Sequence, residues 1–202
     1  MKTSWKMTAA MACALFSPLL ISSTIRADET AAQEPGIWQK HSYSFAFLGF
    51  TSTYSCDGLA DKLKVLLIAA GARPDAKSRA GACASGFGRP DKFARADLTF
   101  YTLALGASPS SGADAPSGSK PVNGTWRPVS FAAHSPRELA TGDCELIEQF
   151  RNNVLPMFTT RNVENHTTCV PHQESGSNID LRFESFTAAR RPPGAGAKPA
   201  GT

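Results

Sequence analysis

The chain has 202 residues, of which 42% are hydrophobic and 19% charged, a composition typical of a globular protein and unlike that of a wholly disordered one. Its formal charge of +4 comes from its two ends, because residues 1–27 contain three of the 21 basic residues and none of the 17 acidic ones, and residues 190–202 contain three more basic residues. Residues 28–189 therefore carry a net charge of −2, which argues against a broad cationic surface for nucleic acid.

Residues 1–27 predict an export signal. Lys2 and Lys6 form a basic start, the run 7–21 is largely apolar, and Ala27 offers a cleavage position. The run is shorter than the roughly 18–20 apolar residues of a membrane anchor, and no second run of that length follows it. We therefore expect a periplasmic or secreted protein with no membrane span in the mature chain.

An internal repeat organises the rest of the sequence. Four markers recur in the same order at nearly constant offset: Gly36-Ile37-Trp38-Gln39 as Gly124-Thr125-Trp126-Arg127, Cys56 as Cys144, Cys83 as Cys169, and residues 96–103 as 179–186. The pattern predicts a tandem duplication, with unit one at 36–105 and unit two at 124–189. The alternative is a chance recurrence of common residues.

Three segments outside the units lack a core-forming pattern. Residues 28–35 are a polar lead-in, and residues 106–123 are rich in glycine, serine and proline, which predicts a flexible linker. Residues 190–202 bury too little apolar surface to offset their ordering entropy and predict a disordered tail.

Unit one begins with an aromatic, partly alternating segment at 42–50, which predicts a strand. A helix is expected to begin at Ser55 or Asp57 and to end at Gly71. A short strand at 77–84 and a turn at 86–91 follow. The apolar positions of the helix are Leu59, Leu63, Leu66, Leu67 and Ala70, and the last strand, 94–103, alternates Ala96, Leu98, Phe100 and Thr102 on one face.

Unit two predicts the same order of elements. A strand near 128–133 precedes a helix led by Asp143, in which Pro156 should kink or shorten the last turn. The stripe of this helix is Ile147, Phe150, Val154 and Phe158. Strands at 162–170 and 179–186 complete the unit.

The repeated order of strand, helix, strand and strand predicts an α+β fold of two βαββ units. Such units can form two small layers or one continuous antiparallel sheet with both helices packed on one face. We favour the single sheet, because a unit of about 70 residues has a thin core by itself.

The mature chain would retain four cysteines, which allow three pairings. The repeat selects a bridge within each unit, Cys56–Cys83 and Cys144–Cys169, each worth roughly 3 kcal/mol by chain entropy. The alternative is a reactive thiolate at a helix N-terminus, which Cys56 and Cys144 would suit. Since no Cys-x-x-Cys pair occurs and export favours oxidation, we favour structural disulfides.

One loop and one pair of acidic residues are further candidate sites. The loop 86–95 could bind an anion through Arg89, Lys92 and Arg95, although its Pro-Asp pair is also an ordinary turn signal. Asp97 and Asp180 recur in the repeat and could meet as an acid–base pair, or could face outward beside arginines.

The aromatic and imidazole side chains indicate no ligand or metal site. We expect the repeated Trp38 and Trp126 to anchor the edge of each unit rather than to bind a ligand. The four histidines do not recur at matching positions, so we expect no metal site and no cofactor.

The stretch Tyr43-Ser44-Phe45-Ala46-Phe47-Leu48-Gly49-Phe50-Thr51-Ser52-Thr53-Tyr54-Ser55-Cys56-Asp57-Gly58-Leu59, continuing to Leu67, resembles uncharacterised exported proteins of proteobacteria, including Xanthomonas relatives. The resemblance covers mainly unit one. It implies an exported compartment and no particular activity.

The sequence favours a non-catalytic periplasmic or secreted binding module for a small ligand or an envelope protein. One alternative is an enzyme of unfamiliar type, a hydrolase or thiol-dependent catalyst with its site between the units. The other is a structural or assembly partner in the envelope, whose strand edges pair with another chain.

Overall fold

Alternation of apolar and polar residues produces the long strands of this protein. The computed structural model describes residues 32–82, 90–106 and 120–189, and all of them belong to one compact unit. The long strands are β1 (Glu34–Leu48), β3 (Phe93–Leu105), β4 (Val122–Ala132) and β8 (Asp180–Ala188), and the shorter strands are β2 (Lys77–Ala80), β5 (Thr160–Asn165), β6 (Thr168–Val170) and β7 (Gln173–Asn178).

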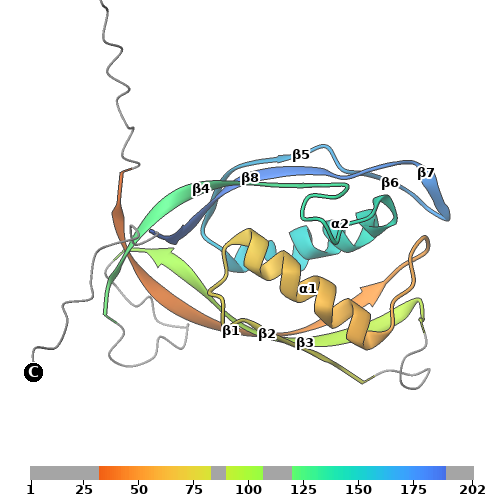
Figure 1. Ribbon diagram of the computed structural model, residues 1–202, viewed down its shortest axis with the longest axis horizontal. Coiled ribbons are helices and arrows are strands. Elements are labelled where there is room, and N and C mark those ends of the chain that lie inside the picture. The colour runs from red at the N-terminus through yellow and green to blue at the C-terminus, as the bar shows by residue number, and fades with distance from the viewer. Residues whose placement is uncertain (1–31, 83–89, 107–119, 190–202) are drawn as a thin grey trace, which may run out of the picture. The chain divides into compact units, whose positions relative to one another are not determined.

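Six of these strands form one antiparallel sheet in the order β2-β3-β1-β4-β8-β5, and β6 pairs with β7 in a separate sheet (Figure 1). The prediction of an α+β protein with an antiparallel sheet is confirmed. The first half of the sheet, residues 34–105, contains strand, helix, strand and strand. The second half, residues 122–188, has the same order with the β6–β7 hairpin added before β8.

Local capping chemistry sets the ends of the helix α1 (Cys56–Ala70). The Ser55 hydroxyl accepts a hydrogen bond from the Gly58 N–H at 3.1 Å, and Gly71 adopts φ 108°, which places it in the left-handed region that glycine tolerates. The Gly71 N–H closes the last turn on the Ile68 carbonyl. Both ends were predicted from the sequence and are confirmed.

The helix α2 (Cys144–Asn153) ends before Pro156, in agreement with the prediction that this proline shortens the last turn. Val154 and Phe158, which were expected on the helical stripe, lie beyond its end. Pro156 lies in a 3-10 turn, Leu155–Met157, that follows the helix after one residue. Asp143 precedes the helix but makes no side-chain capping bond to it. Its carboxylate instead accepts hydrogen bonds from other side chains, which are described below.

One core joins both helices to one face of the sheet (Figure 1). The fully buried side chains include, from the helices, Leu59, Leu63, Leu66, Leu67 and Phe150, and from the strands, Phe45, Phe47, Leu98, Phe100 and Phe131. Because helix and strand residues belong to the same cluster, the single-sheet arrangement with helices on one face holds in preference to two separate layers.

Four strand predictions need correction. The strand expected near 128–133 begins at Val122, and the short strand expected at 77–84 ends at Ala80. The first strand was expected at Ser42 but begins at Glu34, since residues Glu34–Gly36 pair with β4. The strand expected at 162–170 is divided into β5 and β6. Asn162 has a positive φ of 53°, the pairing with β8 shifts after Arg161, and Thr168 pairs with Asn178 rather than with β8.

The cysteine prediction is confirmed in the second half of the sheet. Cys144, the first residue of α2, forms a disulfide with Cys169 in β6. In the first half, Cys56 is buried at the start of α1, and its predicted partner Cys83 lies outside the described residues.

Two glycine backbones form the junction between the halves of the sheet. A Cβ atom at Gly124 would lie 2.3 Å from Phe186 and 2.7 Å from Leu103, and one at Gly36 would lie 2.7 Å from Leu103 and 2.8 Å from Phe186. These side chains therefore occupy the space that any larger residue would need. The repeated Gly-x-Trp motif contains both glycines, and close packing explains why it needs them.

We predict that Gly124→Ala lowers the free energy of unfolding by about 1–3 kcal/mol, because the added methyl group overpacks the contact with Phe186 and Leu103. Urea denaturation measures the change. Gly58→Ala is the control, since its Cβ would meet only Ser55 Oγ within 4 Å, at 3.0 Å, and we expect a change below about 1 kcal/mol.

A double-mutant cycle tests the cause. Shortening Phe186 to leucine should relieve part of the clash, so Gly124→Ala should cost less in the Phe186→Leu background than in the natural protein. Additive effects of the two changes would show that the glycine is not required for this contact.

Candidate functional site

The predicted basic loop is only partly described. Arg89 lies outside the described residues, whereas Lys92 and Arg95 are exposed at the start of β3. The Arg95 N–H points to Cys56 Sγ at 3.5 Å and its carbonyl accepts from the Gly81 N–H, so its backbone serves the sheet. Anion binding by these three side chains stays a prediction.

The two repeated aspartates do not form a pair. Asp97 is exposed on β3 and Asp180 begins β8, and two other strands separate β3 from β8 in the sheet. Asp180 forms an ion pair with Arg182 at 2.9 Å. Asp180 therefore fits the alternative interpretation, in which the aspartate lies beside an arginine and takes no part in an acid–base pair.

The thiol-nucleophile alternative is wrong for Cys144, because its sulfur is bonded to Cys169. Within the described ranges, no group of three or more His, Cys, Asp or Glu side chains is arranged to hold a metal ion. His134, His166 and His172 are exposed, and His41 is half-buried.

A pocket of about 580 Å³ lies at the C-terminal end of α1. The segment that follows the helix, strand β1, strand β4 and the end of β8 all contribute to its lining, so it draws on both halves of the sheet. Its lining includes Trp38, Ile68, Pro74, Trp126 and Pro128. The two tryptophans of the repeat, expected to act as anchors, thus line one pocket.

Arg73 also lines this pocket, and its charge is compensated. Its guanidinium forms two hydrogen bonds with Asp75, at 2.7 and 2.6 Å, and lies 3.7 Å from the centre of the Tyr101 ring. The hydrogen bonds lower the pKa of Asp75, so both groups are charged at neutral pH. Arg73 therefore contributes to the pocket wall a planar guanidinium whose charge is already compensated by Asp75.

Arg127 differs from Arg73. Its Nη2 donates to the Ala69 carbonyl in the last turn of α1 at 2.9 Å, while its Nε is buried without a hydrogen-bond partner. Within the described residues, no acidic side chain forms an ion pair with it. The Thr125 hydroxyl beside it in β4 is likewise buried without a partner.

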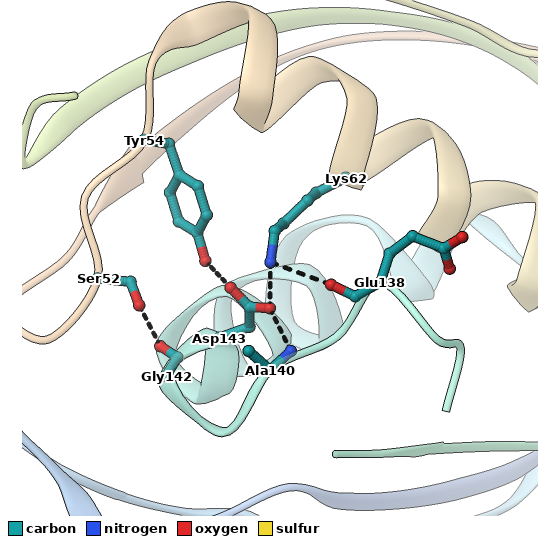
Figure 2. Close-up of polar contacts among 7 residues, drawn as sticks. All are labelled: Ser52, Tyr54, Lys62, Glu138, Ala140, Gly142 and Asp143. Carbon is teal, nitrogen blue, oxygen red and sulfur yellow. Dashed lines mark hydrogen bonds and ion pairs between the residues drawn. The ribbon is translucent and has the colours of Figure 1, made fainter. Parts of the chain in front are cut away.

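A second polar cluster surrounds Asp143 and is fully paired (Figure 2). The Tyr54 hydroxyl donates to one carboxylate oxygen, and the Lys62 ammonium and the Ala140 N–H donate to the other. Lys62 also donates to the Glu138 carbonyl at 3.2 Å. The cluster joins the segment before α1, the helix itself and the segment before α2.

Burial and the charge of Asp143 keep the Tyr54 hydroxyl protonated. Burial, then the charge of Asp143, raises the pKa of Tyr54 far above its usual value of about 10, so the phenol keeps its proton and acts as a donor. The Asp143 side chain is only 3% exposed, and Lys62 supplies its counter-charge. Both carboxylate oxygens are occupied by protein donors, which favours a structural role over a catalytic one.

We predict that Asp143→Ala lowers the free energy of unfolding by about 3 kcal/mol, because it leaves the Tyr54 hydroxyl and the Lys62 ammonium without their acceptor. Chemical denaturation measures the loss. Asp180→Ala is the matched control, since its ion pair with the 62%-exposed Arg182 should be worth less than about 1 kcal/mol. Equal losses in the two variants would contradict a structural role for the Asp143 cluster.

His41 is half-buried and hydrogen-bonded in the folded protein. Its Nε2 lies 2.8 Å from the Thr102 hydroxyl, and that hydroxyl donates its only proton to the Met157 carbonyl, so Nε2 must be the donor. Burial lowers the pKa of His41 below its usual value of about 6.5. In the pH range between the two values, the unfolded chain binds a proton that the folded chain does not.

We therefore predict that the free energy of unfolding falls as the pH drops below about 6.5 toward the lowered pKa of His41. His41→Gln should reduce this slope, and His134→Gln, at an exposed histidine, should leave it unchanged. The test is to measure the denaturation midpoints of the natural protein and both variants between about pH 7 and pH 5. Identical slopes in all three proteins would show that His41 does not contribute.

Sequence analysis singled out the tryptophans but missed Arg127 and Thr125 as site residues. The available signal was their place inside the repeated motif, since Thr125 and Arg127 flank Trp126. The motif alone does not show that the end of α1 and strand β8 lie next to Thr125 and Arg127.

Comparisons with family models, with curated proteins and with solved structures gave no match to this chain. In the part of the chain that the structure describes, no helix is long and apolar enough to cross a membrane.

Proposed function

We propose that this protein is an exported, non-catalytic binding module that holds a small, planar and largely apolar molecule in the pocket at the end of α1. The observation that carries the proposal is the lining of this pocket by Trp38 and Trp126. Its volume of about 580 Å³ falls in the range of roughly 300–1,000 Å³ typical of small-molecule sites.

The chemistry of the walls favours a flat apolar ligand body. Indole rings offer a large and rigid apolar surface, and Ile68, Pro74 and Pro128 extend it. Trp126 is held in place, because its ring packs 5.4 Å from the Phe186 ring and its Nε1 donates to Glu34 at 3.1 Å. A wall fixed in this way can receive a ligand without much loss of side-chain entropy.

The proposal includes a tandem duplication of two βαββ units. Three observations support it: the shared order of elements, the equivalent pairing of β1 with β3 and of β4 with β8, and the mirrored contacts of Gly36 and Gly124. Duplication would account for a pocket with one tryptophan from each unit.

Export is also part of the proposal. Its support is the pattern of residues 1–27 and the disulfide between Cys144 and Cys169, a bond that persists in oxidising compartments. The Asp143 cluster does not favour the enzyme alternative, because both oxygens of its carboxylate already accept protein donors.

We predict that the full chain binds naphthamide, a neutral planar probe, and that binding shifts the indole N–H signals of Trp38 and Trp126 in nitrogen-15 NMR spectra. Trp38→Ala should weaken binding about tenfold, which corresponds to the loss of one aromatic stacking contact. Titration by NMR gives the affinity.

Phe93→Ala is the control variant, because Phe93 is 63% exposed and is absent from the pocket lining. It should bind the probe as the natural chain does. The proposal fails if millimolar naphthamide leaves both indole signals in place, or if Trp38→Ala and Phe93→Ala bind equally well.

A further inference from the structure

We infer that the natural ligand carries a single carboxylate, bound by a polar patch on the face of β4 and β8 that packs against the end of α1. The patch consists of Thr125 and Arg127 on β4 and of Ser185 and Thr187 on β8. This inference rests on the proposed function and specifies the chemical class of the ligand.

Strand register brings the four side chains of the patch together. Arg127 pairs with Ser185 and Thr125 pairs with Thr187, and residues that are directly opposite in an antiparallel pair point to the same face. Thr125, Arg127 and Thr187 line the pocket, and Ser185 is fully buried beside Arg127.

The end of α1 lies against this patch. A Cβ atom at Gly71 would lie 2.4 Å from Thr187 Cγ2 and 2.9 Å from Ser185 Oγ. Only a glycine allows the helix end to come this close. Gly71 also lines the pocket, so the patch, the helix end and the pocket are contiguous.

Three polar atoms of the patch have no partner. Of the five side-chain atoms in the described residues that are buried without a hydrogen bond, three belong here: Thr125 Oγ1, Arg127 Nε and Ser185 Oγ. An unpaired buried polar group costs about 1–3 kcal/mol, and such groups are rare. Three in contiguous positions give the patch donors that no acceptor in the described residues satisfies.

The charge balance selects the acceptor. Arg73 is neutralised by Asp75. Arg127, among the described residues, donates to the Ala69 carbonyl and to no carboxylate, at the end of a helix whose dipole offsets about half a charge. Bound water could hydrogen-bond to the two hydroxyls but would not compensate the remaining charge. One monovalent anion satisfies both requirements, and a carboxylate accepts N–H and O–H donors together.

The test compares naphthoate with naphthamide, which share a planar body and differ in charge. We expect the full chain to bind naphthoate at least tenfold more tightly than naphthamide, as measured by calorimetry and by NMR. Arg127→Gln should weaken naphthoate far more than naphthamide and so remove this preference. Arg73→Gln, at the arginine that is already paired, should retain the preference.

Each outcome separates the two proposals. If neither probe binds, the proposed function fails and the inference fails with it. If both probes bind equally well, the pocket holds planar ligands and the carboxylate inference alone is wrong. The inference is also wrong if the preference for naphthoate survives in Arg127→Gln.

A second variant protects the test against loss of folding, because Arg127 also contacts the end of α1. Thr125→Val keeps the shape of the side chain and removes its hydroxyl. It should weaken naphthoate binding several-fold more than naphthamide binding. An equal effect on both probes would overturn the role assigned to Thr125 in the patch.

Discussion

The close approach of side chains to Gly36 and Gly124 is the constraint on which the rest of the structure depends. Strands β1 and β4 pair only between Glu34–Gly36 and Val122–Gly124, so the six-stranded sheet is continuous through this short contact. Leu103 and Phe186 fill the space above both glycines. Trp38 and Trp126, each two positions after one of these glycines, therefore line the same pocket.

A second connection joins the halves through their helices. Tyr54 and Lys62 from the first half meet the carboxylate of Asp143, and the Phe50 and Thr51 N–H groups donate to Glu145 at 2.9 and 3.0 Å. These groups lie some 90 residues apart in the chain, and the carboxylates are buried. The sheet junction and this charged connection together restrict how the halves can move, which favours a pocket of fixed geometry.

Features of the fold that depend on local chemistry were predictable, and those that depend on distant pairing were not. Ser55, Gly71 and Pro156 mark helix ends through their own backbone preferences, and the Cys144–Cys169 bridge followed from the repeat. The early start of β1 depends on pairing with β4, which no local pattern reveals. The neighbourhood of Arg127 and Ser185 likewise requires the register between strands 58 residues apart in sequence.

The two polar clusters differ in whether their hydrogen bonds are satisfied within the protein. This difference favours a structural role for the cluster at Asp143 and a binding role for the one at Arg127. Around Asp143, the buried carboxylate receives donors from the phenol, the ammonium and a backbone N–H, so the cluster stabilises the fold without help from outside. Around Arg127, donors outnumber acceptors, and three of the five buried side-chain polar atoms that lack a hydrogen bond in the described residues lie together. A fold that leaves such donors beside an indole-lined pocket has lost stability there, and a ligand that accepts their hydrogen bonds restores it.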